Sequence, residues 1–191
     1  DSWGISYTEY YSSNGSITDS PNGDYAPNSM NEIFLNDTID LTMQSTAELT
    51  FYAKWDIESG WDYAQVSVST DYGNSWQAMC GLYTKDGNQY QDFGQPIYDG
   101  SQNDWIQESI DLNDYIGEFI MLKFSLVSDG YVEEDGFYYD DLKITGSSEV
   151  GVYEFNNNFN IYPNPSTGII NLKLTHKSTG PIQIANINGQ V

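Results

Sequence analysis

Apolar and polar side chains alternate with a period of two along much of the first 146 residues. In the clearest stretch, 48–55, every second side chain is apolar, and this face consists of Leu49, Phe51, Ala53 and Trp55. Similar alternation recurs at 64–69, 120–126 and 138–144. Alternation of this kind predicts β-strands with one buried face. No long segment repeats at the helical period, so we exclude a helical fold.

Turn-forming stretches rich in glycine, asparagine, aspartate and serine separate the predicted strands. Examples lie at 12–15, 20–24, 85–88 and 128–136. Many short strands with one apolar face are typical of two antiparallel sheets packed face to face. We therefore predict an all-β protein with a two-sheet antiparallel β-sandwich, and favour the jelly-roll topology.

The alternating pattern lapses at 147–158, where glycine, serine, glutamate and three consecutive asparagines are typical of a linker. This linker divides the chain into a jelly-roll domain, 1–146, and a tail, 159–191. Strands of the tail are predicted at 159–162, 169–174 and 182–187, followed by an Asn188-Gly189 turn. An Asn-Gly pair predicts a hairpin. The sequence contains no returning strand, so we expect the tail to be an incomplete small β-sandwich.

The charge balance restricts the partners. Aspartate and glutamate number 28 against six basic residues, all of them lysine, and the formal net charge is −22. Such a surface repels nucleic acid and anionic lipid, so we expect no nucleic-acid partner. No apolar run reaches membrane-spanning length, so we expect no membrane insertion. Carboxylates suit calcium, although the same charge also serves solubility alone.

The position of histidine limits the chemistry of the chain. The single histidine, His176, lies in the tail. Residues 1–158 therefore hold no Ser-His-Asp or Cys-His arrangement and no two-histidine zinc site. Paired carboxylates of the glycosidase type remain open, but no motif places two acids across a cleft. We predict that this chain has no catalytic residue and is not itself an enzyme.

One string, residues 69–76, matches the Asp-box pattern S-x-D-x-G-x-x-W. The pattern occurs in sialidases, where it recurs once per propeller blade, but it is found once here. Short polar side chains and a glycine are suited to closing a tight turn. We therefore interpret the string as a turn stabiliser.

Two acidic segments suggest a structural calcium ion. Asp19 lies in a loop of oxygen-bearing residues, and alternation along the last strand places Asp140 on the inner face, next to Asp141. A carboxylate in a core requires a partner, and the chain has no arginine to supply one. Calcium shared by Asp19, Asp140 and Asp141 would satisfy it, with Glu58 and Asp62 as further candidate ligands. The alternative is that a β-bulge shifts the alternation and leaves both last-strand aspartates in solvent.

Several strings of the first domain carry a family resemblance. They are Asp19-x-x-x-Gly23-x-Tyr25, Leu49-Thr50-Phe51, Trp61-Asp62-Tyr63-Ala64 and Asp140-Asp141-Leu142. These strings resemble MAM-like jelly rolls, especially the accessory β-sandwich of immune inhibitor A peptidases and some bacterial zinc carboxypeptidases. The resemblance implies a partner catalytic domain that carries the zinc ligands. It also implies calcium binding through the aspartate loop and the last-strand aspartates.

The tail carries a second resemblance. The string Tyr162-Pro163-Asn164-Pro165 and the pattern around it resemble the N-terminal part of the C-terminal sorting domain of type IX secretion substrates. This resemblance implies recognition by the type IX secretion machinery. It also implies export across the outer membrane, to the medium or the cell surface.

Three functions compete for the first domain. The leading hypothesis is a non-catalytic accessory module of a secreted or surface hydrolase, a metallopeptidase in our interpretation. A carbohydrate-binding module is the alternative, with a glycan stacked on exposed tryptophans. By alternation Trp55 faces the core and Trp76 belongs to a turn, which leaves Trp61 and Trp105 as candidates. The third is an adhesin domain, which an acidic, tyrosine-rich surface permits.

Overall fold

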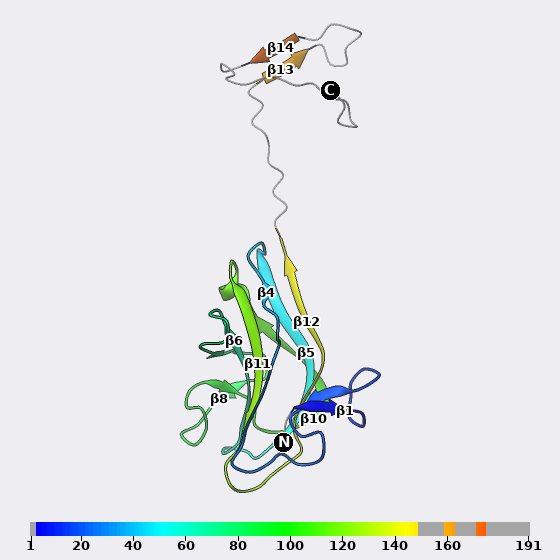
Figure 1. Ribbon diagram of the computed structural model, residues 1–191, viewed down its shortest axis with the longest axis vertical. Helices are drawn as coiled ribbons and strands as arrows, with labels where there is room; N and C mark the ends of the chain where they lie inside the picture. The colour runs from blue at the N-terminus through cyan, green and yellow to red at the C-terminus, as the bar shows by residue number, and fades with distance from the viewer. Residues whose placement is uncertain (1–2, 149–158, 163–170, 175–191) are drawn as a thin grey trace. The chain divides into compact units, whose positions relative to one another are not determined.

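The structure is a computed structural model that describes residues 3–148, 159–162 and 171–174 (Figure 1). The chain divides into two compact units, Asp1–Glu149 and Val150–Val191. No helix among the described residues is long and apolar enough to cross a membrane.

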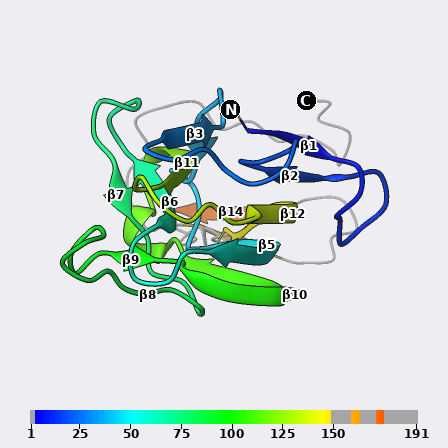
Figure 2. The same cartoon turned by 90° about the horizontal axis from the view of Figure 1, so that it is seen from below.

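The first unit contains two antiparallel sheets, which form separate layers in the end-on view of Figure 2. The first sheet has the order β1 (Gly4–Ser6), β2 (Ser16–Thr18), β12 (Gly136–Ser147), β5 (Thr46–Ile57) and β10 (Gly100–Asp111). The second has the order β3 (Met30–Phe34), β11 (Phe119–Val127), β6 (Tyr63–Ser69) and β7 (Gln77–Ala78), and β4 (Ile39–Asp40) also pairs with β11. A small ladder joins β8 (Lys85–Asp86) to β9 (Pro96–Ile97), and the 3₁₀ helix η1 covers Asn113–Tyr115.

The strand order is that of a jelly roll. Strands from opposite ends of the chain are neighbours: β2 pairs with β12 in one sheet and β3 with β11 in the other. Two further pairings, β5 with β10 and β6 with β7, complete the double Greek key. The predicted all-β sandwich is therefore confirmed.

The core lies between the inner faces that alternation predicted. On β5, Leu49, Phe51, Ala53 and Trp55 are all buried. From the facing sheet, β6 contributes Val66 and Val68, and β11 contributes Ile120, Leu122, Phe124 and Leu126. Aromatic rings fill the centre, where Phe51 meets Phe124 edge to face at a centroid distance of 5.4 Å. The prediction that Trp55 faces the core is confirmed.

The Asp-box string forms a turn, as interpreted. The Asp71 carboxylate accepts hydrogen bonds from the Ser75 amide at 2.9 Å, the Ser75 hydroxyl at 2.6 Å and the Ser69 hydroxyl at 2.8 Å. Gly73 adopts a φ of +84° inside this turn, a conformation that glycine takes without a steric penalty. Trp76 packs beside it, with the Lys123 ammonium 4.9 Å from its ring centroid.

The second unit contributes one described strand pair. Strand β13 (Phe159–Tyr162) pairs antiparallel with β14 (Asn171–Leu174), as predicted for the first two strands of the tail. The predicted strand at 182–187 and the Asn188-Gly189 turn lie outside the described residues.

One buried acid anchors a surface segment to the core. Glu108 occupies a fully buried position on β10, where it interrupts the apolar face. Its carboxylate accepts hydrogen bonds from the amides of Leu82 at 2.7 Å and Tyr83 at 3.1 Å, and from the Tyr98 hydroxyl at 3.0 Å. Gly81 passes so close that a Cβ there would lie 2.8 Å from the carboxyl carbon. The Glu108 carboxylate thus ties residues 81–83 to the first sheet.

We expect Glu108→Ala to lower the free energy of unfolding by about 3 kcal/mol, because two amides and a buried hydroxyl lose their acceptor. Urea denaturation of the full chain measures the loss. Glu48→Ala removes an exposed carboxylate from the neighbouring strand β5 and should change stability by less than about 0.5 kcal/mol. Equal unfolding midpoints for Glu108→Ala and the unsubstituted chain would contradict this anchoring role.

Candidate metal centre

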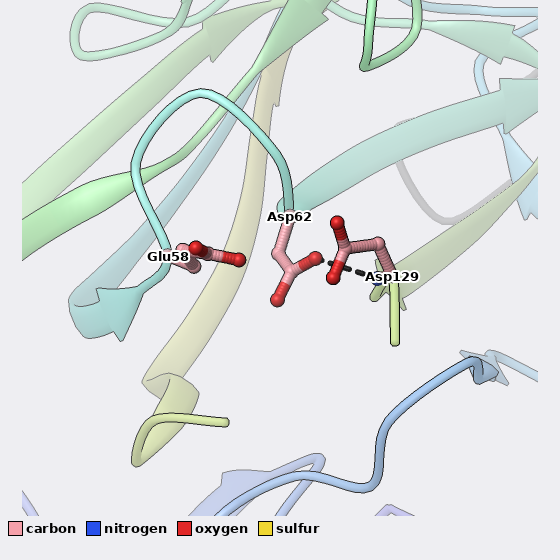
Figure 3. A group of neighbouring side chains, drawn as sticks. All are labelled: Glu58, Asp62 and Asp129. Atoms are coloured by element: carbon pink, nitrogen blue, oxygen red, sulfur yellow. Dashed lines mark hydrogen bonds between the residues drawn. The ribbon is translucent and has the colours of Figure 1, made fainter. Parts of the chain in front are cut away.

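Three carboxylates converge at one end of the sandwich. Glu58 and Asp62 lie in the turn that links β5 to β6, and Asp129 follows the end of β11. Because β6 and β11 are antiparallel, with Tyr63 opposite Val127, the start of one strand lies beside the end of the other. The pairing therefore brings Asp62 next to Asp129, and the turn places Glu58 on the other side of Asp62 (Figure 3).

The carboxylate cluster of Glu58, Asp62 and Asp129 has the dimensions of a cation site. One ligand oxygen from each residue lies within 4.8 Å of the others. Asp62 is fully buried; its Oδ1 accepts the Asp129 amide at 2.6 Å and its Oδ2 the Tyr25 hydroxyl at 2.8 Å. The Tyr25 hydroxyl also accepts the Glu58 amide at 3.1 Å, which fixes the start of the turn. Glu58 Oε2 is enclosed and has no hydrogen-bond partner.

The electrostatics of this cluster disfavour three ionised carboxylates without a counter-ion. Loss of solvation raises the pKa of Glu58, and the charges of Asp62 and Asp129 raise it further. Loss of solvation also raises the pKa of Asp62, although the hydrogen bonds from Asp129 and Tyr25 act in the opposite direction. The ion pairs of the described residues leave the cluster without a lysine: they join Lys54 to Glu9, Lys85 to Asp99 and Lys123 to Glu32.

The carboxylate cluster fits a calcium ion. Calcium prefers hard oxygen ligands and accepts carboxylates together with carbonyls and water. The cluster supplies three carboxylates, and the enclosed oxygen of Glu58 is a donor atom without a partner. Of the predicted ligands, the structure brings together Glu58 and Asp62.

Asp19 lies in a different contact network. It is fully buried, its Oδ1 accepts the Phe137 amide at 2.7 Å, and its Oδ2 is enclosed without a partner. Burial raises the pKa of Asp19 to about 7, against the lowering effect of the Phe137 hydrogen bond. The neighbouring Ser20 hydroxyl donates to the Asp135 carbonyl. Asp19 therefore joins the loop after β2 to the first residues of the last strand.

The prediction that Asp140 faces the core is wrong. The register of β12 against β5 shifts between Asp140 and Lys143, and Asp141 adopts a φ of +49°. This bulge breaks the alternation, so Asp140 is half-buried and Asp141 is exposed. The Asp140 Oδ2 accepts the amides of Tyr11 at 2.9 Å and Ser12 at 2.8 Å, and so closes the loop between β1 and β2.

The predicted grouping of Asp19 with Asp140 and Asp141 is not assembled within residues 3–148, where the only set of three acids at ligand distance is Glu58, Asp62 and Asp129. Asp129 is absent from the predicted ligands, because 128–136 has the composition of a turn-rich stretch. The predicted strands could have indicated this contact. If the strand at 64–69 pairs antiparallel to the strand at 120–126, the residues just before position 64 lie beside the residues just after position 126.

Comparisons with known proteins identify both units. Residues 8–155 match the family described as immune inhibitor A-like, MAM domain, and residues 160–191 match the secretion system C-terminal sorting domain. The chain is 28% identical to the pre-pro-metalloprotease PrtV of Vibrio cholerae over 100 residues, which cover 52% of this chain and 10% of that protein. It is 27% identical to bacillopeptidase F of Bacillus subtilis over 126 residues, which cover 66% of this chain and 8% of that protein.

The chain thus spans about a tenth or less of the length of these curated relatives. The match confirms the predicted resemblance to an accessory domain of peptidases. The sorting domain confirms export by the type IX route. Because the first family model covers more than half of the residues, the chain belongs to the immune inhibitor A-like MAM domain family, with a secretion sorting domain after it.

Proposed function

We propose that this chain is the calcium-stabilised accessory module of an exported peptidase, and that it supports a catalytic domain carried elsewhere in a longer protein. Two relatives named as peptidases support the peptidase assignment, although the alignments span a small part of each. The observation that carries the calcium assignment is the carboxylate cluster of Glu58, Asp62 and Asp129 with its unpartnered oxygen. Bound calcium would supply structural charge neutralisation there.

The residues of the cluster explain what the ion would stabilise. Glu58 and Asp62 belong to the connection between the two sheets, from β5 in the first to β6 in the second. Asp129 belongs to the segment that leads from β11 in the second sheet back to β12 in the first. A cation held by all three carboxylates therefore clamps both crossings at one end of the sandwich. Such a clamp would hold an accessory module rigid beside its catalytic partner.

We expect calcium to raise the thermal midpoint of the full chain by on the order of 5 °C at a hundredfold excess over its dissociation constant, because it binds only the folded state. Differential scanning fluorimetry with calcium or with a chelator measures the shift. Asp129→Asn should abolish most of the shift. Asp140→Asn is the matched control and should retain it, since Asp140 serves the loop after β1. Loss of the shift in Asp140→Asn but not in Asp129→Asn would contradict the assignment.

Asp19 makes the free energy of unfolding depend on pH, and the direction of this dependence follows from its pKa shift. Its pKa is raised from 3.8 to about 7 on folding, so the folded state holds a proton that the unfolded state releases. The contribution of Asp19 to the free energy of unfolding should therefore decrease as pH rises from about 4 to about 7. Below about pH 4 and above about pH 7 it should stay constant. Asp19→Asn mimics the protonated acid and should flatten this part of the profile.

Chemical denaturation at several pH values, with chelator present to exclude calcium, measures the profile. The charge of Asp135 also raises the pKa of Asp19, so Asp135→Asn should move the transition to lower pH without removing it. Parallel profiles for Asp19→Asn and the unsubstituted chain would show that Asp19 does not take up a proton on folding.

A further inference from the structure

Three exposed aromatic side chains gather beside the turn that carries Glu58 and Asp62. Trp61 is 44% exposed, Tyr90 59% and Phe93 75%. The rings of Trp61 and Tyr90 stack at a centroid distance of 4.4 Å and an interplanar angle of 27°. Together the three line a shallow depression of about 460 Å³ with Gly60, Asn88 and Gln89. We call these three residues the aromatic platform.

Polar contacts within and between two loops hold the platform in place. Two loops supply it: residues 58–62, and residues 87–95 between β8 and β9. The Asn88 side chain joins them, since its Nδ2 donates to the Gly60 carbonyl at 2.9 Å and its Oδ1 accepts the Tyr90 amide at 2.7 Å. The buried Asp99 Oδ2 accepts the Gly60 amide at 2.9 Å and Gln91 Nε2 at 2.8 Å, and Asp99 also pairs with Lys85.

This support gives a ligand surface that needs little ordering on binding. A site that is already in place avoids the conformational cost that flexible loops incur. Exposed aromatic groups on rigid loops are also unfavourable in water, so their presence requires a reason other than stability. A core-packing role does not apply to Phe93, whose side chain is mostly exposed.

The lining indicates the chemistry of the ligand. It consists of aromatic faces and the amides of Asn88 and Gln89, with no charged side chain among the residues that form the depression. Gln89 is exposed and makes no hydrogen bond with another described residue. A sugar ring presents an apolar face of C–H groups for stacking and hydroxyls at its rim for amides. We propose that the aromatic platform binds a neutral glycan chain, which extends the module beyond its accessory role.

Charge and position argue against anionic glycans and against polypeptides that bind by strand addition. The turn that carries Trp61 also carries Glu58 and Asp62, and the whole chain has a net charge of −22, so anionic glycans are repelled. Polypeptides that add to a protein by backbone pairing require a free strand edge. The platform residues lie on loops, and they offer side-chain surfaces in place of such an edge.

The test is isothermal titration calorimetry of the full chain, in calcium-containing buffer throughout, with cello-, manno- and xylo-hexasaccharides and an anionic oligogalacturonate. We expect at least one neutral hexasaccharide to bind and the anionic one not to bind. Trp61→Ala and Tyr90→Ala should each weaken binding tenfold or more, and Trp61→Phe should restore part of it. The control is Tyr11→Ala, which removes another aromatic stack, Tyr11 on the half-buried Tyr52 at a centroid distance of 3.5 Å, and should leave binding unchanged.

Three outcomes overturn the proposal. One is the absence of binding to every neutral hexasaccharide at millimolar concentration. Another is equal affinity of Trp61→Ala and the unsubstituted chain, with folding of the variant verified by circular dichroism. The third is binding of unfolded carboxymethylated casein that is lost in Trp61→Ala, which would assign the platform to polypeptide. The calcium-dependent thermal midpoint of each variant is recorded separately, so failure of the glycan site is distinguishable from failure of the calcium site.

Discussion

Carboxylates buried without an arginine partner are the constraint on which this structure depends. The chain carries 28 acidic residues and no arginine, yet Asp19, Asp62 and Glu108 are fully buried. A buried charge is costly unless hydrogen bonds or a counter-ion compensate it. Glu108 is compensated by amides and a hydroxyl, whereas Asp19 and the cluster of Glu58, Asp62 and Asp129 each keep an enclosed oxygen without a partner. What distinguishes the cluster as a candidate ligand set is that three carboxylates converge around such an oxygen, whereas Asp19 belongs to no group of three acids at ligand distance among the described residues.

The same acids organise the loops on which function depends. Asp62 and Tyr25 fix the connection from β5 to β6, and that connection carries Trp61 of the aromatic platform. Asp99 contacts both loops of the platform, through Gly60 on one and Gln91 on the other. A calcium ion at the carboxylate cluster would therefore act on the turn that also presents the proposed glycan surface. Both properties would serve the proposed accessory module.

Local pattern was sufficient to predict the sheets, and insufficient where the chain departs from regular geometry. Alternation located β5, β6 and β11 and their buried faces, since period two follows directly from strand geometry. It misplaced Asp140, because the bulge that ends the alternation depends on the positive φ of Asp141. Alternation also does not predict the position of Asp129, for a different reason. Its contact with Asp62 exists only once β6 and β11 pair, which is a property of topology.

A crystal structure of the full chain grown in calcium would show whether the carboxylate cluster binds the ion. We expect an anomalous-scattering peak between Glu58, Asp62 and Asp129, with carboxylate oxygens at about 2.3–2.6 Å from the ion. A calcium peak beside Asp140 and Asp141, with none between these three residues, would contradict it.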